Sequence, residues 1–220
     1  MRKGLFKLIA LFITGLTLIG CGEVASFEPG VKVSGRFVDA PVEGLHYECS
    51  SGLSGVTDVD GTFTCQENDD VTFKIGTLAI GSCSVEDVVT PLHLHKGIEN
   101  EQKAYNVAQL LHSLDNDSDP SNDIKLDSNL LAQLSFDSVN IESDGQTFQN
   151  EIASVLASVS KTEYDRALAI AKMLSYIDEH SDVDVSSVSN LNIKDELKFL
   201  EILICDSSQK LEKGECVAKN

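Results

Sequence analysis

Tryptophan is absent from this 220-residue sequence, and basic side chains are scarce: 17 lysines and arginines stand against 35 aspartates and glutamates. The formal net charge of -18 repels nucleic acid and anionic lipid headgroups, because both carry dense negative charge. The sequence also lacks a Gly-x-Ser-x-Gly elbow, a phosphate-binding loop, a dinucleotide-binding fingerprint and a His-Glu-x-x-His zinc motif. We therefore expect no nucleic-acid partner, and the missing motifs favour a binding module over the familiar enzyme classes.

The first twenty residues have the pattern of a secretory signal peptide. Three basic residues precede an apolar run over residues 8–20, which is shorter than the roughly 20 residues that a membrane-spanning helix needs. The run ends in Leu18-Ile19-Gly20-Cys21. This ending resembles the lipobox of bacterial lipoproteins, in which a signal (here residues 1–20) is removed and the following cysteine receives diacylglycerol. The alternative is an ordinary signal in which Cys21 merely follows the cleavage site.

The lipoprotein resemblance implies a location. Cys21 would anchor the mature chain to a membrane outside the cytoplasm, and residues 21–30 would form a lipidated tether. Gly22 stands where an aspartate often directs retention in the inner membrane, so the resemblance favours the outer membrane. Removal of the three basic residues leaves 14 basic against 35 acidic side chains, a net charge of -21. Such acidity favours cations and basic partners, or it serves only to keep an exported domain soluble.

The sequence has six cysteines, and five remain when Cys21 is set aside. An odd number leaves one thiol over or implies an intermolecular bond. Two cysteines end strand-like runs, and two others bracket a polar stretch near the C-terminus whose closure would contribute about 3 kcal/mol. An exported location permits disulfides, and no Cys-x-x-Cys spacing points to zinc. We predict two disulfides, Cys49–Cys65 and Cys205–Cys216, with Cys83 left over.

Residues 31–92 show the alternation of half-buried β-strands. Apolar and polar side chains alternate in short runs over residues 31–37, 45–49, 62–65, 71–75 and 78–80. Turn residues separate these runs, and Asp60-Gly61 supplies the positive φ that a tight hairpin needs. Several short strands with frequent turns predict a small antiparallel β-sandwich.

One stretch of this half resembles a known kind of module. Residues 57–63 read Thr-Asp-Val-Asp-Gly-Thr-Phe, and Gly-Arg-Phe-Val-Asp precedes them at residues 35–39. Both stretches resemble carboxypeptidase-regulatory-like, prealbumin-type β-sandwich modules. The resemblance implies an exported surface module that serves as a binding unit, a spacer or a structural support and is rarely catalytic.

Residues 97–204 show helical periodicity instead. Apolar stripes at helical spacing occupy residues 104–114, 148–159 and 164–177, and Thr162–Asp165 has the pattern of a capping box for the third. A short helix is expected near residues 128–134, whereas residues 196–204 suit either a helix or a strand. The fold prediction is therefore α+β: a small antiparallel β-sandwich over 31–92, a small helical bundle over 97–204, and a disulfide loop and tail over 205–220.

An acidic loop follows the first predicted helix. Oxygen-bearing side chains recur at alternate positions, which brings their oxygens together as Ca2+ requires: Asp115, Asp117, Asp119, Ser121 and Asp123. The spacing resembles EF-hand-like and thrombospondin-type calcium loops. It departs from them at Pro120, where a glycine makes the turn, and at Leu126, where an acid closes the shell. The alternative is a solvated linker whose aspartates cap backbone amides.

Two further groups of residues are candidate metal ligands. On a strand, His93 and His95 would face one side as a two-imidazole metal edge, or they are plain surface histidines. Asp58 and Asp60 either bind a metal or simply form a turn.

Three functions remain open. The leading one is a membrane-anchored, non-catalytic module for binding, scaffolding or adhesion, with Ca2+ as a candidate structural ion, whose protein or glycan ligand the sequence does not name. The second is an accessory subunit of an envelope assembly. The third is an unrecognised hydrolase with its site at the junction between the two halves.

Overall fold

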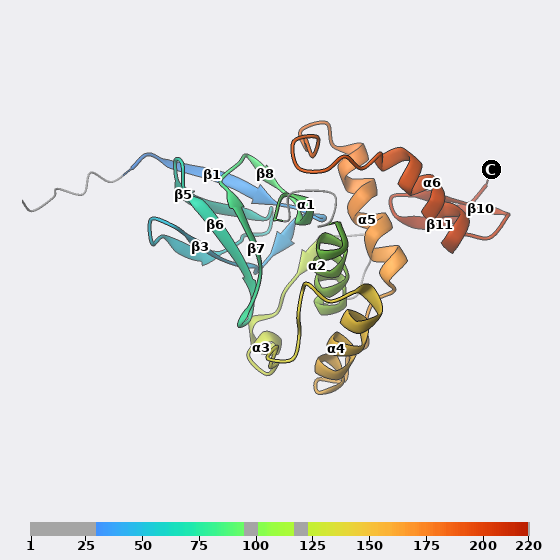
Figure 1. Cartoon of the computed structure of the whole chain (residues 1–220), viewed down its shortest axis with the longest axis horizontal. Helices are drawn as coiled ribbons and strands as arrows, with labels where there is room; N and C mark the ends of the chain where they lie inside the picture. The colour runs from blue at the N-terminus through green and yellow to red at the C-terminus, as the bar shows by residue number, and fades with distance from the viewer. Residues whose placement is uncertain (1–29, 95–100, 117–122, 220) are drawn as a thin grey trace, which may run out of the picture.

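The computed structural model of this chain describes residues 30–94, 101–116 and 123–219. Its architecture is mixed α+β, with β-sheets first and a small set of helices after them, as the sequence predicts (Figure 1). No helix within the described ranges is both long and apolar enough to cross a membrane.

Two sheets form the N-terminal half. One has three strands in the order β5-β1-β8, and the other has four in the order β4-β3-β6-β7. All neighbours are antiparallel except β1 and β8, which are parallel. The strands of the first sheet are β1 (Lys32–Phe37), β5 (Thr62–Gln66) and β8 (Val88–Val89). Those of the second are β3 (His46–Cys49), β4 (Ser54–Val56), β6 (Asp70–Ile75) and β7 (Leu78–Ser84).

The two sheets pack through aromatic side chains. The ring of Phe73 on β6 lies 4.8 Å from that of Phe37 on β1 and 5.2 Å from that of Phe63 on β5, the second contact being edge-on. All three rings are buried, because the alternating pattern turns every second side chain inward. The disulfide Cys49–Cys65 joins β3 to β5 and therefore links one sheet to the other covalently. It is one of the two pairs that the sequence predicts.

The second half is mainly helical. Its helices are α1 (Pro91–Leu94), α2 (Glu101–Leu114), α3 (Ser128–Leu131), α4 (Gly145–Ala157), α5 (Arg166–Glu179) and α6 (Ile193–Ile204). The segment with two possible structures, residues 196–204, is therefore helical. A parallel pair of short strands, β2 (Val42–Glu43) and β9 (Ile124–Lys125), connects the sandwich to this half.

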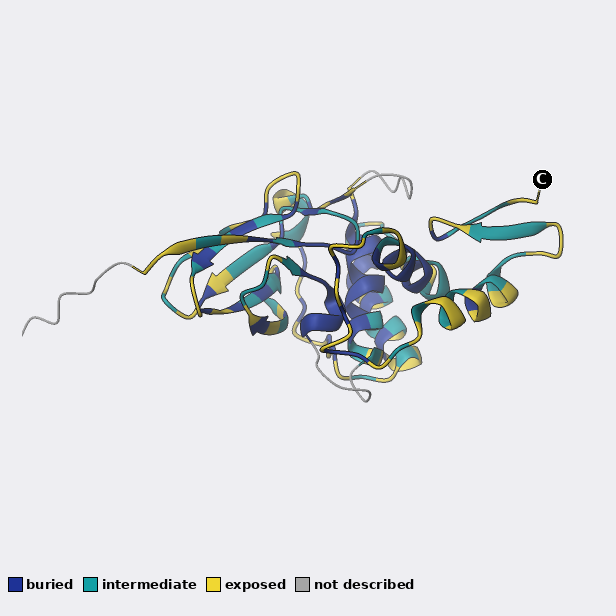
Figure 2. Cartoon of the chain, turned by 90° about the horizontal axis from the view of Figure 1, so that it is seen from above, coloured by how far each residue is buried: buried dark blue, intermediate teal, exposed yellow. Residues whose placement is uncertain are grey.

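Helix α2 packs against both halves of the chain. Its Leu110, Leu111 and Leu114 are fully buried in one apolar cluster with the sandwich and α4. Its Ala104 and Ala108, one turn apart, are buried in a second cluster with α5. The small alanine side chains allow the two helices to approach closely. Dark blue helices in the middle of Figure 2 show how completely this part is buried.

The chain ends in a hairpin, β10 (Gln209–Glu212) and β11 (Glu215–Ala218). The second predicted disulfide, Cys205–Cys216, ties the end of α6 to this hairpin. At its turn Gly214 has a φ of +72°, and a Cβ there would lie 2.5 Å from Cα of Lys172 on α5. The hairpin turn therefore packs directly on α5. Cys83, the remaining cysteine of the described residues, is buried in β7.

Two local predictions are wrong. The capping box at Thr162–Asp165 does not open α5, which begins at Arg166 with Asp165 as its N-cap. Tyr164, just before this N-cap, is held away from the helix by two hydrogen bonds to α2. Its N–H donates to Ser113 Oγ at 2.8 Å, and its carbonyl accepts from Gln109 Nε2 at 3.0 Å. His93 also does not lie on a strand: it is a buried residue of α1.

Candidate functional site

Most buried polar side chains of α2 have hydrogen-bond partners. Asn106 donates through Nδ2 to the carbonyls of Ile141 and Ser143, at 2.8 and 2.9 Å. Gln109 accepts at Oε1 from Arg166 Nη1 at 3.0 Å. These bonds fasten neighbouring loops to the helix, and they satisfy groups that would otherwise be costly to bury.

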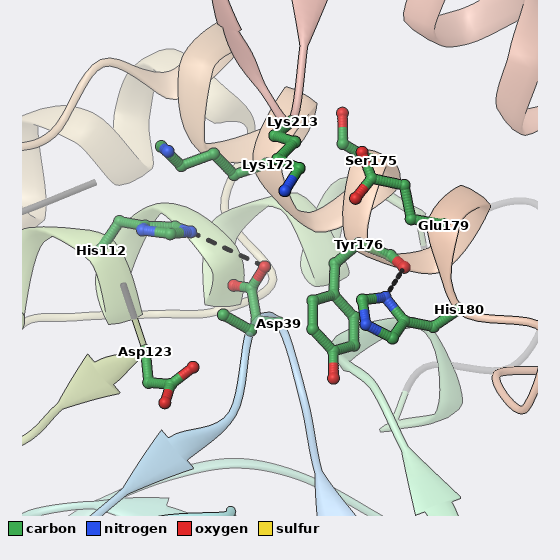
Figure 3. A pocket seen from close by; sticks show the side chains of 10 residues that line it. Asp39, His112, Asp123, Lys172, Ser175, Tyr176, Glu179, His180 and Lys213 are labelled. Carbon is green, nitrogen blue, oxygen red and sulfur yellow. Dashed lines mark hydrogen bonds and ion pairs between the residues drawn. The ribbon is translucent and has the colours of Figure 1, made fainter. Parts of the chain in front are cut away.

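His112, on the same helix, is the exception. Its Nε2 lies 3.7 Å from Oδ1 of Asp39, which is too far for a hydrogen bond (Figure 3). Both oxygens of Asp39 and Nε2 of His112 are buried without a hydrogen-bond partner. Within the described ranges these three atoms are the whole set of such orphaned side-chain atoms. All of them lie at one place, where the sandwich meets the helices.

Asp39 reaches this place through a tight turn after β1. Val38 and Pro41 form an antiparallel bridge, so Asp39 and Ala40 make the tip of the turn. A turn tip is normally exposed, but here Val38 is fully buried in the apolar cluster that contains Leu174 of α5. That packing carries the carboxylate of Asp39 into the helical half, where its side chain is 0% exposed.

A cavity of about 200 Å³ opens beside the pair. The side chains around it carry both signs of charge, as Figure 3 shows. They come from the end of the acidic loop, from α5 and from the hairpin turn: Asp123, Lys172, Tyr176, Glu179, His180 and Lys213. Three separate parts of the chain therefore complete one pocket.

One wall of the pocket is aromatic. The rings of Tyr176 and His180 stack with their centroids 3.9 Å apart, and the main-chain carbonyl of Tyr176 lies 2.8 Å from Nδ1 of His180. Burial raises the pKa of Tyr176, so its hydroxyl stays protonated at neutral pH. Nearby, Nζ of Lys172 lies 3.1 Å from Oε1 of Glu215, which holds a cation at the side of the pocket.

The geometry suits recognition of a cationic group. A buried carboxylate without hydrogen bonds is unfavourable unless a donor or a positive charge reaches it. His112 offers one more nitrogen beside it, and the ring of Tyr176 offers a π face. The same carboxylate and imidazole are also the components of a general acid–base pair.

The predicted calcium ligands are only partly described. Asp117, Asp119 and Ser121 lie outside the described residues. Asp115 is 4% exposed, and its Oδ1 accepts the N–H of Lys125 at 2.9 Å, which closes the base of the loop. Asp123 lines the pocket, and its pKa is raised by burial and by the charge of Asp60.

A different group has metal-like spacing but another role. Cys49, Cys65 and Asp69 have potential ligand atoms within 4.8 Å of one another. The two sulfurs are bonded to each other, and the carboxylate of Asp69 accepts four hydrogen bonds from Ser50, Ser51 and the N–H of Gln66. The two cysteines and Asp69 therefore have structural roles in the fold.

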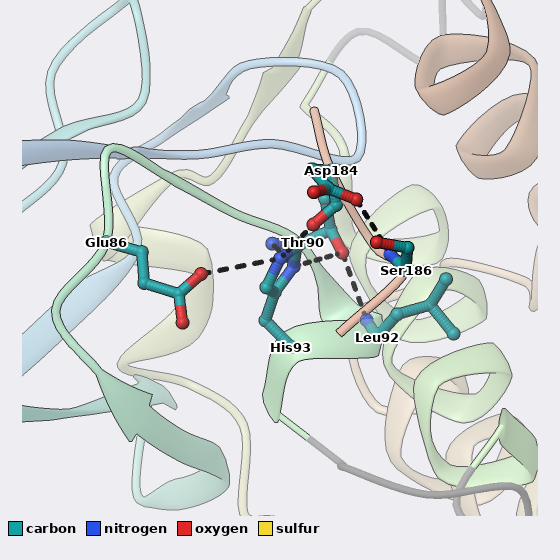
Figure 4. A network of polar contacts seen from close by, with 6 residues as sticks. All are labelled: Glu86, Thr90, Leu92, His93, Asp184 and Ser186. Carbon is teal, nitrogen blue, oxygen red and sulfur yellow. Dashed lines mark hydrogen bonds and ion pairs between the residues drawn. The ribbon is translucent and has the colours of Figure 1, made fainter. Parts of the chain in front are cut away.

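His93 belongs to a separate, structural network, shown in Figure 4. The N–H of Thr90 donates to its Nδ1 at 3.0 Å, which places the imidazole proton on Nε2. That nitrogen donates to the carbonyl of Asp184 at 3.2 Å and lies 3.7 Å from Oε2 of Glu86. His93 thus fastens the loop after α5 to α1 and does not line the pocket. His95 and Cys21 lie outside the described residues.

Sequence reasoning missed the pair at the centre of the site. His112 stands alone in the sequence, and Asp39 reads as a turn residue. One signal was present, because His112 follows Ala108 by one helical turn and therefore shares its buried face. Nothing local indicates that the turn at Asp39 inserts beside that face.

Comparison of the chain with protein-family models, with curated proteins and with solved structures finds no match.

Proposed function

We propose that this chain is an exported, lipid-anchored and non-catalytic binding module, and that the pocket beside Asp39 and His112 holds its ligand. The ligand that we propose is a small molecule with an ammonium group. One observation carries the proposal: a fully buried carboxylate has no hydrogen-bond partner among the described residues and lies at a pocket.

The chemistry of the pocket supports a ligand of this class. An ammonium group brings positive charge and several donors to the two oxygens of Asp39. The ring of Tyr176 adds a cation–π contact. Lys213 stands on the same pocket and suits a carboxylate at the other end of the ligand. A cavity of about 200 Å³ is smaller than most drug-sized pockets. A free amino acid therefore suits both its charge and its size.

The proposed location outside the cytoplasm is supported by separate observations. The two disulfides indicate an extracytoplasmic protein. The lipid at Cys21 and the outer membrane remain part of the proposal, supported by the leader sequence. A net charge near -21 in the mature chain attracts cationic ligands to the surface.

Calcium is a further part of the proposal, as a structural ion of the loop from Asp115 to Asp123. The closed base of the loop and the nearby charge of Asp60 support it. Isothermal titration of Ca2+ into the mature chain tests it, with Asp117→Ala as the variant. We expect millimolar or tighter binding that the variant loses; equal heats in both proteins would reduce the loop to an acidic linker.

Thermal shift and calorimetry with the twenty amino acids and putrescine test the pocket. At least one should raise the melting temperature of the mature chain, and Asp39→Asn should abolish the effect. Asp137→Asn is the matched control, because it removes one exposed acid in the loop between α3 and α4, away from the pocket. If no compound binds, or if the Asp39 variant binds as well as the parent, the pocket is not the ligand site.

A hydrolase is the second candidate, and the contact between Asp39 and His112 favours it. In that case His112 is the base and Asp39 orients it. If the protein is a hydrolase, it should turn over an ester or peptide substrate, and His112→Gln should abolish this turnover. Binding without turnover supports the binding module instead.

A further inference from the structure

The pocket beside Asp39 has an excess of negative charge. Its lining carries two lysines and three carboxylates, those of Asp39, Asp123 and Glu179. One of the lysines, Lys172, places its Nζ 3.1 Å from Oε1 of Glu215, an acid outside the lining. The charge of Lys172 is therefore balanced from outside the pocket, and a ligand with a net positive charge balances the carboxylates within it.

The charged groups of the pocket differ in depth. The side chain of Asp39 is 0% exposed. Three other charged residues of the lining are exposed and form the mouth of the pocket: Asp123, Glu179 and Lys213. In Figure 3, Lys213 and Glu179 lie on one side of Asp39, and Asp123 lies on the other. The buried end thus presents one carboxylate, whereas the mouth presents both signs of charge.

The buried end suits an ammonium group that has no carboxylate beside it. In an amino acid the α-ammonium and the α-carboxylate are bonded to the same carbon. If the α-ammonium contacted Asp39, the ligand's own carboxylate would come close to that buried carboxylate, and like charges repel strongly where water is excluded. An ammonium at the end of an alkyl stem avoids this repulsion, and the stem can pack on Ala40 and Tyr176, which also line the pocket.

We propose that the ligand is a diamino acid of the lysine or ornithine type, with its side-chain ammonium against Asp39 and its α-amino acid end at the mouth. This inference rests on the proposed function and specifies the ligand and its orientation. At the mouth, Lys213 suits the α-carboxylate, and Glu179 suits the α-ammonium.

Calorimetry with a matched series of ligands tests the orientation. L-lysine or L-ornithine should give saturable heat with the mature chain. L-norleucine has the stem of lysine without the terminal ammonium, and it should bind about a hundredfold more weakly or not at all, because Asp39 then stays buried without a partner. Cadaverine, which is lysine without its α-carboxylate, should still bind.

Lys213→Gln tests the contact at the mouth. It should weaken the binding of L-lysine about two- to fivefold, as expected for an exposed ion pair, and leave that of cadaverine unchanged. Lys213 has a φ of +51°, which glutamine adopts as readily as lysine, so the substitution adds no backbone strain. Lys32→Gln is the matched control, because Lys32 is exposed on β1 and does not line the pocket. Circular dichroism should show both variants folded.

The outcomes separate this inference from the proposed function. The diamino acid is overturned, and the pocket kept as a ligand site, if norleucine binds as tightly as lysine. The same conclusion follows if Lys213→Gln changes the binding of lysine and of cadaverine equally. The absence of heat from every ligand of the series would overturn both proposals.

Discussion

His112 Nε2 lies 3.7 Å from Asp39 Oδ1, and the two side chains are 7% and 0% exposed. Within the described ranges, every fully buried side-chain nitrogen or oxygen other than the two oxygens of Asp39 and Nε2 of His112 has a hydrogen-bond partner. A fold that leaves its orphaned polar atoms at a single pocket keeps unfavourable energy where a ligand can relieve it. This relationship is the basis of the proposed function, and it also has a consequence for stability.

Asp39→Asn should stabilise the protein without ligand. The substitution removes a buried charge, and the new amide can donate to His112 Nε2. We expect the free energy of unfolding at pH 7 to rise by about 1–2 kcal/mol. Urea unfolding followed by circular dichroism measures it. A loss of similar size would show that the folded protein already satisfies this carboxylate.

The two disulfides should contribute to stability in different ways. Cys49→Ala with Cys65→Ala removes the disulfide that joins β3 of one sheet to β5 of the other, across a separation of 16 residues. The double substitution should lower the free energy of unfolding by about 3 kcal/mol. Cys205→Ala with Cys216→Ala should chiefly free the terminal hairpin, with faster hydrogen exchange over residues 209–218. Equal global losses from both pairs of substitutions would contradict this difference.

Acid should weaken the protein through Asp69. Its hydrogen bonds, with that from Ser51 Oγ the strongest, hold the pKa of this carboxyl below its usual range. The ionised form therefore stabilises the folded state above the unfolded pKa of about 3.9, and this contribution disappears as the pH falls through the lower folded pKa. Urea midpoints of the parent and Asp69→Asn should differ at pH 7 and converge toward pH 3. A difference that is constant with pH would rule out this origin.

Cys21→Ser should abolish incorporation of labelled palmitate in the producing cells. The parent chain should float with membranes after lysis, and the variant should stay in the soluble fraction of the envelope. Cys83→Ser is the matched control and should keep its label. Label that persists in the Cys21 variant would exclude the lipid anchor.

The sequence predicted the parts of this fold that depend on local pattern. Alternation in residues 62–65 and 71–75 and the stripe in 104–114 survive in the structure, because burial of one face decides each of them. The pairing of Cys49 with Cys65 followed from the same alternation, since both side chains point inward from facing strands.

The failures share a physical cause, which is contact between distant segments. The start of α5 moved because Ser113 on α2 holds the N–H of Tyr164. The candidate site was missed because it needs the turn at Asp39 to insert between α2 and α5, and no local pattern encodes that insertion. Tertiary packing, rather than any residue preference, created both features.

Calorimetry of amino-acid binding to the mature chain tests the central claim most directly, with the parent, Asp39→Asn and Asp137→Asn compared under one condition. The account predicts saturable heat with at least one amino acid in the parent and in Asp137→Asn, and none in Asp39→Asn. The absence of heat in all three proteins, or equal heat in all three, would contradict it.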